Sequence, residues 1–174
     1  MLRLIAIIVI ALSSAMTAYA QTGSPSATGG EPDGLESGLV RAMRPNAQRD
    51  GRLTESGEAI RPYITAGYLR LKPELREDYT DYRIVRKPAK LFGQELVVIE
   101  EEYQLKFVGC CVNEGIGAVV RVTADLAALK QFAAANGCSL NTDADVVERL
   151  RKLKLPARGA FLSISCRERD MEKR

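Results

Sequence analysis

The clearest pattern of apolar and polar positions in the chain lies between residues 95 and 112. Most odd-numbered positions there are apolar, from Val97 to Cys111, whereas the even-numbered positions include Glu100 and Glu102. A period of two is typical of a β-strand that buries one face and exposes the other to water. The pattern therefore predicts a long strand at 95–112, with Glu100 and Glu102 on its solvent-facing side.

Shorter apolar segments predict four further strands. They are expected at 67–71, 79–85, 118–122 and 160–166. The sequence Asn-Glu-Gly at 113–115 separates the long strand from the segment at 118–122, and such residues favour a turn. These two strands are therefore expected to form an antiparallel hairpin.

Three other segments carry apolar residues at helical spacing. The apolar stripe from Leu126 to Phe132 predicts a helix that ends at Gly137, a typical C-terminal cap. A second helix is expected to begin near residue 141 and to end before Pro156, and a short third helix is expected at 35–43. The two longer helices follow most of the strands in the sequence.

This order of elements predicts an α+β fold. The expected architecture is a small antiparallel or mixed sheet of about four to five strands, with two helices packed on one face. A chain of 174 residues suits one such domain, since domains commonly have about 100–200 residues.

The first twenty residues have the pattern of a secretory signal peptide. Arg3 supplies a positive charge, residues 4–12 are all apolar, and Ala18 and Ala20 are the small residues that a signal peptidase recognises. The apolar run is too short for a membrane anchor, which needs about 20 residues. The sequence therefore predicts cleavage before Gln21 and an exported protein, periplasmic or secreted.

Composition divides the rest of the chain into four parts. Residues 21–34 are rich in Gly, Pro, Ser and Thr and predict a flexible leader. Residues 35–59 predict a weakly ordered N-terminal segment, and residues 60–167 predict the single α+β domain. The charged residues 168–174 predict a solvated tail. No membrane span is expected once the signal peptide is removed.

The charge balance and the lack of histidine exclude several kinds of function. The chain has 25 Lys and Arg against 22 Asp and Glu, a net charge of +3, and no His. A net charge this small does not indicate a nucleic-acid partner. Without histidine, the chain lacks Ser-His-Asp and Cys-His catalysis and histidine metal sites.

Four cysteines in an exported chain predict disulfide bonds. A bond between the neighbours Cys110 and Cys111 is disfavoured, because adjacent side chains of a strand point to opposite faces. We prefer the pairs Cys111–Cys138 and Cys110–Cys166, since Cys111 has the buried parity of the long strand. A bulge at Gly109 would reverse this parity and exchange the partners of Cys110 and Cys111. The chain has no Cys-x-x-Cys motif, so zinc or redox chemistry is less favoured.

Two acidic motifs allow a chemical interpretation, but neither assigns a site. Glu100 and Glu102 would lie about 7 Å apart in a strand, a spacing that overlaps that of inverting glycosidases. Any strand with alternating Glu has this spacing, so no catalytic residue is predicted. Asn141, Asp143 and Asp145 resemble the start of a calcium loop, but the required Gly and Glu are missing, and helix capping explains them better. We expect no metal and no cofactor.

A candidate binding region of tyrosine and basic residues lies in and just after the predicted strand at 79–85. They are Tyr79, Tyr82, Arg83, Arg86 and Lys87, which could bind an acidic surface. The favoured function is an exported, non-enzymatic protein-binding module, such as an inhibitor, an immunity-type protein or an accessory envelope protein. One alternative is a carboxylate-dependent hydrolase of cell-wall glycan. Another is a structural envelope protein without a dedicated partner.

Overall fold

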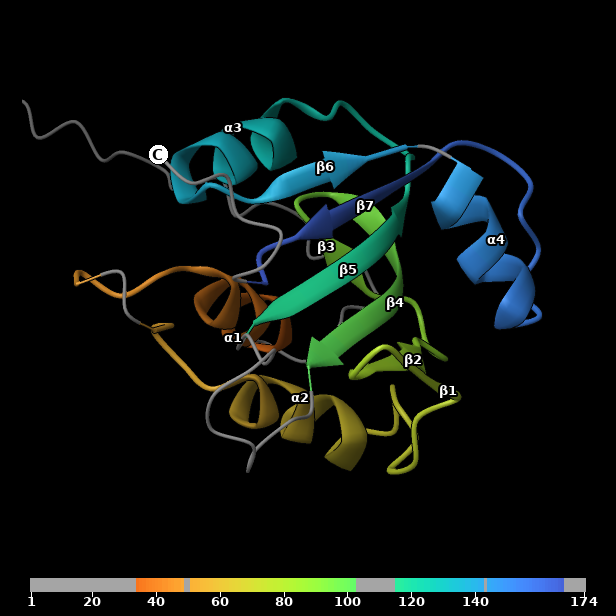
Figure 1. The fold of residues 1–174 in the computed structure, drawn as a ribbon, viewed down its shortest axis with the longest axis horizontal. Helices are drawn as coiled ribbons and strands as arrows, with labels where there is room; N and C mark the ends of the chain where they lie inside the picture. Colours follow the sequence, from red (N-terminus) through yellow and green to blue (C-terminus); the bar gives the residue numbers. More distant parts are fainter. Residues whose placement is uncertain (1–33, 49–50, 103–114, 143, 168–174) are drawn as a thin grey trace, which may run out of the picture.

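The computed structural model describes residues 34–48, 51–102, 115–142 and 144–167, which form an antiparallel sheet flanked by helices (Figure 1). Seven strands belong to the sheet, in the order β1-β2-β4-β5-β7-β6, and β3 also pairs with β4. The strands are β1 (Leu75–Glu77), β2 (Thr80–Ile84), β3 (Lys90–Leu91), β4 (Gln94–Glu102), β5 (Ile116–Arg121), β6 (Ser139–Asn141) and β7 (Phe161–Ser165). The expected α+β class is confirmed, with more strands than the sequence predicted.

Helices cover both faces of this sheet. The four helices are α1 (Leu35–Met43), α2 (Ser56–Thr65), α3 (Ala127–Asn136) and α4 (Ala144–Lys152). The first three pack on one face and α4 packs on the other. The prediction of two helices on a single face is therefore wrong. The reason lies in β5, where Ala118 and Val120 belong to one hydrophobic cluster and Val119 belongs to the other. A strand with apolar side chains on both faces needs other elements packed on both faces.

The larger hydrophobic core lies between the sheet and helices α1, α2 and α3. Leu39 and Met43 of α1 and Tyr63 of α2 are fully buried there, against Ile99 of β4 and Ile164 of β7. Burial of a large apolar side chain stabilises the fold by about 1.5–3 kcal/mol. The short helix predicted at 35–43 is present as α1 and contributes buried side chains to this core.

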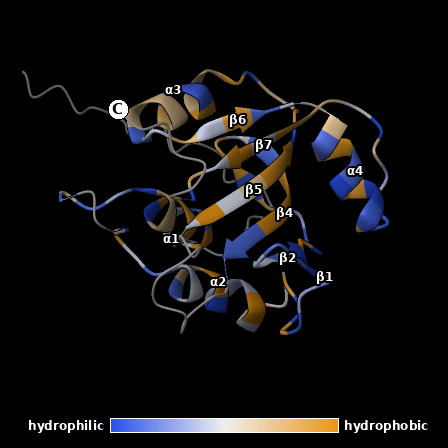
Figure 2. Cartoon of the chain, in the orientation of Figure 1, coloured by the Kyte–Doolittle hydropathy of each residue, from blue (hydrophilic) through white to orange (hydrophobic). Residues whose placement is uncertain are grey.

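The smaller core lies under α4. Val146 and Leu150 of α4 pack with Val98, Val119 and Phe161 of the sheet. In Figure 2, β4 changes from hydrophobic to hydrophilic towards its arrowhead, where the sequence is Glu-Glu-Glu. The face covered by α4 is therefore apolar at one end and charged at the other.

Most of the remaining predicted elements occur near their expected bounds. β2, β5, β7, α3 and α4 match predicted segments, and residues 103–112 of the predicted long strand lie outside the described residues. Residues 67–71 form a loop rather than a strand. The amides of Tyr68 and Leu69 bond to the carbonyl of Tyr63 at the end of α2, so this backbone is not paired in the sheet.

One disulfide, Cys138–Cys166, is present among the described residues. Cys138 precedes β6 and Cys166 follows β7, and the adjacent pair in the ladder is Ser139 with Ser165. The two cysteines therefore face each other across neighbouring strands, with Cα atoms 4.4 Å apart. The predicted pairs Cys111–Cys138 and Cys110–Cys166 are wrong, because β6 was not predicted. Cys110 and Cys111 lie outside the described residues.

Candidate functional site

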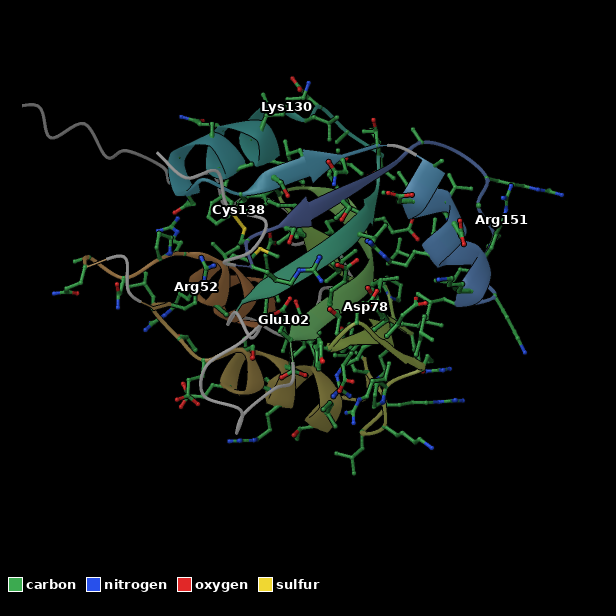
Figure 3. The ribbon with its side chains drawn as sticks, viewed as in Figure 1. Arg52, Asp78, Glu102, Lys130, Cys138 and Arg151 are labelled. Carbon is green, nitrogen blue, oxygen red and sulfur yellow. A yellow bond between two sulfur atoms is a disulfide. The ribbon has the colours of Figure 1, made fainter. Side chains whose placement is uncertain are left out.

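Glu100 and Glu102 are buried, with exposed fractions of 0% and 5%, so their predicted solvent-facing position is wrong. Both lie near the end of β4, where Figure 3 labels Glu102. The predicted parity holds from Val98 onward, whereas a register shift between Leu96 and Val98 places Val97 in a different cluster from Ile99. β4 is an interior strand between β2 and β5, so its polar side is covered. Two carboxylates in such a position need charged or hydrogen-bonding partners.

Two arginines supply these partners. Arg149 of α4 donates to Glu100 Oε1 at 2.6 Å, and Arg167 Nη2 lies 3.2 Å from Glu100 Oε2. Arg167 Nε lies 4.0 Å from Glu102 Oε1. A Cβ atom at Gly117, the residue paired with Glu100 on β5, would lie 2.9 Å from Glu100 Oε2. The glycine therefore provides the space for the buried carboxylate.

Arg167 joins this ion cluster to the neighbouring strands. Its side chain is 5% exposed and donates to the hydroxyls of Ser165 on β7, at 2.9 Å, and Thr80 on β2, at 3.2 Å. The cluster thus connects β2, β4, β7 and α4. Because Glu100 is enclosed and engaged by two guanidinium groups, it does not reach solvent or a substrate in this structure. The geometry favours a structural role for this carboxylate over catalysis.

A second ion cluster lies on the opposite face of the same strands. Arg83 of β2 is 7% exposed, and its Nη2 lies 3.3 Å from both Asp81 Oδ2 and Glu101 Oε2. Arg83 also donates to the carbonyls of Arg70 and Leu71, at 3.2 and 2.9 Å. Arg83 therefore anchors the loop that follows α2, rather than lying on the surface.

Burial has a measurable consequence for Glu101. Loss of hydration raises the pKa of this carboxyl group above its ordinary value, and the charge of Arg83 opposes the rise. Ser56 Oγ, at the start of α2, lies 3.4 Å from Glu101 Oε1. The carboxylate is therefore held between the sheet and α2.

The five predicted binding residues divide into two groups. Tyr82 and Arg83 are buried, and the ring of Tyr82 lies 5.3 Å from the guanidinium of Arg149. Tyr79, Arg86 and Lys87 are exposed. Arg86 pairs with Glu74 at 2.6 Å, and Lys87 Nζ donates to the carbonyl of Ala66 at 2.5 Å, so both basic groups also hold the fold.

One exposed apolar side chain next to this region was missed by the sequence analysis. Leu71 is 81% exposed, and the predicted residue Tyr79 is 50% exposed. Leu71 ends the segment 67–71, which was expected to form a strand and forms a loop instead. We define the hairpin surface by seven exposed residues of the loop after α2 and of the segment around β1 and β2: Arg70, Leu71, Lys72, Arg76, Tyr79, Arg86 and Lys87. The exposed acidic residue Asp78 lies at the β1–β2 turn beside them.

A pocket of about 250 Å³ opens between the β1–β2 turn and α4. Its lining includes four acidic side chains, two basic ones and one tyrosine, namely Glu77, Asp78, Tyr82, Asp145, Glu148, Arg149 and Lys152. Lys152 of α4 donates to both carboxylate oxygens of Glu77 on β1, at 2.7 and 2.9 Å. This ion pair connects the helix to the hairpin beside the pocket.

Two further searches of the described residues found nothing. No group of three or more His, Cys, Asp or Glu side chains in this part of the chain could hold a metal ion. No helix in the described ranges is long and apolar enough to cross a membrane. Comparison of the chain with protein-family models, with curated proteins and with solved structures finds no match.

Proposed function

We propose that the protein is an exported, non-enzymatic protein-binding module that uses the hairpin surface to bind its partner. The observation that carries this proposal is the exposure of Leu71, which is 81% accessible. Tyr79 is half-exposed at the β1–β2 turn of the same surface. Two large apolar side chains at one edge of the sheet support an interaction role.

The composition of this surface supports a protein partner. Arginine and tyrosine are enriched in protein interfaces, and buried anchors of this kind carry much of the binding energy. The exposed charges around Leu71 are mostly basic, from Arg70, Lys72 and Arg76. Arg70 and Arg76 also pair within the fold, with Glu74 and Asp81. A partner with an apolar pocket rimmed by acidic groups fits this pattern, because complementary charge speeds encounter and selects the partner.

The hairpin surface also has a fixed backbone, which lowers the entropic cost of binding. Arg83 is buried and donates to the carbonyls of Arg70 and Leu71. These bonds hold the loop against β2 in the absence of a partner. The loop can therefore present Leu71 without first having to fold.

Export is part of the proposal and has two supports. The first twenty residues have the signal-peptide pattern, and the structure contains the Cys138–Cys166 disulfide, which is typical of proteins in oxidising compartments. Intact-mass measurement of exported protein should show Gln21 as the N-terminal residue. Retention of residues 1–20 on the exported protein would contradict this part of the proposal.

The two alternatives have less support. A glycan hydrolase would need Glu100 or Glu102 to contact substrate, yet both are buried near Arg167. A structural envelope protein without a dedicated partner would bind nothing at the hairpin surface. An experiment on the hairpin surface separates these functions from binding.

The test is affinity capture from an envelope extract with three forms of the protein. We expect the unmodified protein to recover one stoichiometric protein partner. The double variant Leu71→Ser with Tyr79→Asn should lose it, because both apolar anchors are removed while asparagine tolerates the positive φ of 64° at position 79. Leu53→Ser is the matched control, since Leu53 is 46% exposed outside this surface.

Two results would overturn the proposal. One is equal recovery of the partner by the hairpin variant and by the Leu53→Ser control. The other is the absence of any stoichiometric partner in an extract that contains the native envelope proteins. Circular dichroism of each variant verifies that a loss of binding is not a loss of fold.

A further inference from the structure

The pocket between the β1–β2 turn and α4 differs in charge from the hairpin surface. Four of its seven lining residues are acidic, and α4 contributes two of these, Asp145 and Glu148. We propose that this pocket binds an organic cation, with an ammonium or guanidinium group among its carboxylates. The proposal goes beyond the protein-binding function and does not depend on it.

The first step of the argument is the charge that remains after internal pairing. Lys152 neutralises Glu77 through two hydrogen bonds. Arg149 is engaged by Glu100, which is not part of the lining. Among the described residues, neither Asp145 nor Glu148 forms an ion pair or hydrogen bond through its side chain. Both basic groups of the pocket are thus hydrogen-bonded to other carboxylates, Lys152 also lies within electrostatic reach of Glu148, and the lining holds more acidic than basic groups.

The second step is the state of Tyr82. This residue is only 6% exposed, and it lines the pocket. Within the described ranges, its hydroxyl has no hydrogen-bond partner. The hydroxyl is also not one of the fully buried polar atoms without a hydrogen bond. The hydroxyl therefore lies in the small accessible part of the residue, facing the pocket. A phenol oxygen in this position can accept a hydrogen bond from an ammonium or guanidinium group.

The third step is the rigidity and size of the pocket. The ring of Tyr82 is held under Arg149, and Glu77 on the hairpin is tied to Lys152 on α4. These contacts fix the two walls before a ligand enters. A volume of about 250 Å³ is below the usual range for drug-sized ligands, and it suits a single aliphatic amine or one lysine or arginine side chain.

The ligand could be a free diamine or a basic side chain of a protein, since both carry the same cationic group. The test titrates isotope-labelled protein, with its disulfide intact, with two probes and follows amide chemical shifts. The probes are cadaverine and N-acetyl-lysine N-methylamide. We expect saturable shifts that centre on the β1–β2 turn and the start of α4. Tighter binding of cadaverine assigns a free diamine, and tighter binding of the blocked lysine assigns a side chain.

Three variants make the test specific to the pocket. Asp145→Asn with Glu148→Gln should weaken binding about fivefold, because two partly solvated ion pairs are lost. Glu55→Gln with Glu58→Gln is the matched control, since it removes two exposed acidic groups from the start of α2 and leaves the pocket intact. Tyr82→Phe keeps the ring and should weaken binding about threefold through loss of one hydrogen bond.

The proposal is overturned if the pairs of acidic substitutions on α4 and on α2 weaken binding equally, since the attraction would then be a general effect of net charge. It is also overturned if neither probe gives saturable shifts in the pocket. Unchanged affinity of Tyr82→Phe, with thermal unfolding showing an intact fold, would exclude the hydroxyl as a ligand group and contradict the proposed mode of binding.

Discussion

Replacement of Arg167 by methionine should destabilise the protein strongly. Arg167 is 5% exposed, and its guanidinium lies 3.2 Å from Glu100 and 4.0 Å from Glu102. Methionine keeps an unbranched apolar stem of similar reach but removes the charge and the hydrogen bonds to Ser165 and Thr80. The two carboxylates would then remain buried with less compensation.

The expected loss follows from the geometry of this ion cluster. Removal of one partner from a buried ion pair costs about 3–5 kcal/mol. Glu100 keeps Arg149 at 2.6 Å, so we expect the lower end of the range, about 3 kcal/mol. Domains of this size are stable by about 5–15 kcal/mol, so the variant should fold and remain measurable.

Urea denaturation followed by far-ultraviolet circular dichroism measures this change. Arg158→Met is the control, because Arg158 is exposed and its replacement should alter the free energy of unfolding by less than about 0.5 kcal/mol. Adding Glu102→Gln to Arg167→Met should recover part of the loss, since one of the two buried charges is neutralised. If Arg167→Met costs no more than Arg158→Met, the ion cluster does not stabilise the fold and the reasoning is wrong.

Three further predictions concern other parts of the fold. Arg83→Glu should lower the free energy of unfolding by more than about 3 kcal/mol, because a buried cation becomes an anion beside two carboxylates. Arg86→Glu, at an exposed ion pair, should lower it by less than about 1 kcal/mol. Similar urea midpoints for the two variants would contradict this ranking. Because the pKa of Glu101 is raised in the folded state, this carboxyl group loses its proton in the unfolded state first as the pH rises. Its contribution to stability is therefore fully present below the ordinary pKa of 4.5 and declines as the pH rises through the pKa of the folded state. Glu101→Gln should remove that decline, and an unchanged slope of unfolding free energy against pH would count against it. Reduction of Cys138–Cys166, which spans 28 residues of sequence, should lower the free energy of unfolding by about 3 kcal/mol; an unfolding midpoint that does not change with reductant would refute this.

The sequence predicted elements whose signal is local. The strand at β4, the apolar stripe of α3 and the cap at Gly137 depend on neighbouring residues, and all three occur in the structure. The predicted alternation of buried and exposed positions does not occur in β4, where nearly every residue is buried. α2 was not predicted, because Pro62 interrupts its pattern. Its place in the fold depends on contacts such as the burial of Tyr63 against the sheet, which no local pattern shows.

The charged groups show where local reasoning ends. Parity placed Glu100 on the polar side of its strand, but parity does not say which element covers that side. The cover comes from Arg149 and Arg167, which lie 49 and 67 positions further along the chain. The disulfide has the same origin, because only the pairing of β6 with β7 brings Cys138 to Cys166.

The cross-link at Cys138 also bears on an edge of the sheet. Among the described residues, β6 is an edge strand of three residues, bonded to β7 on one side only. Edge strands can recruit strands of other molecules, and short length is one way to limit this. The disulfide ties the start of β6 to the end of β7, so separation of the two strands is limited at that end. Such a bond disfavours exposure of the longer strand β7 to the strands of other molecules.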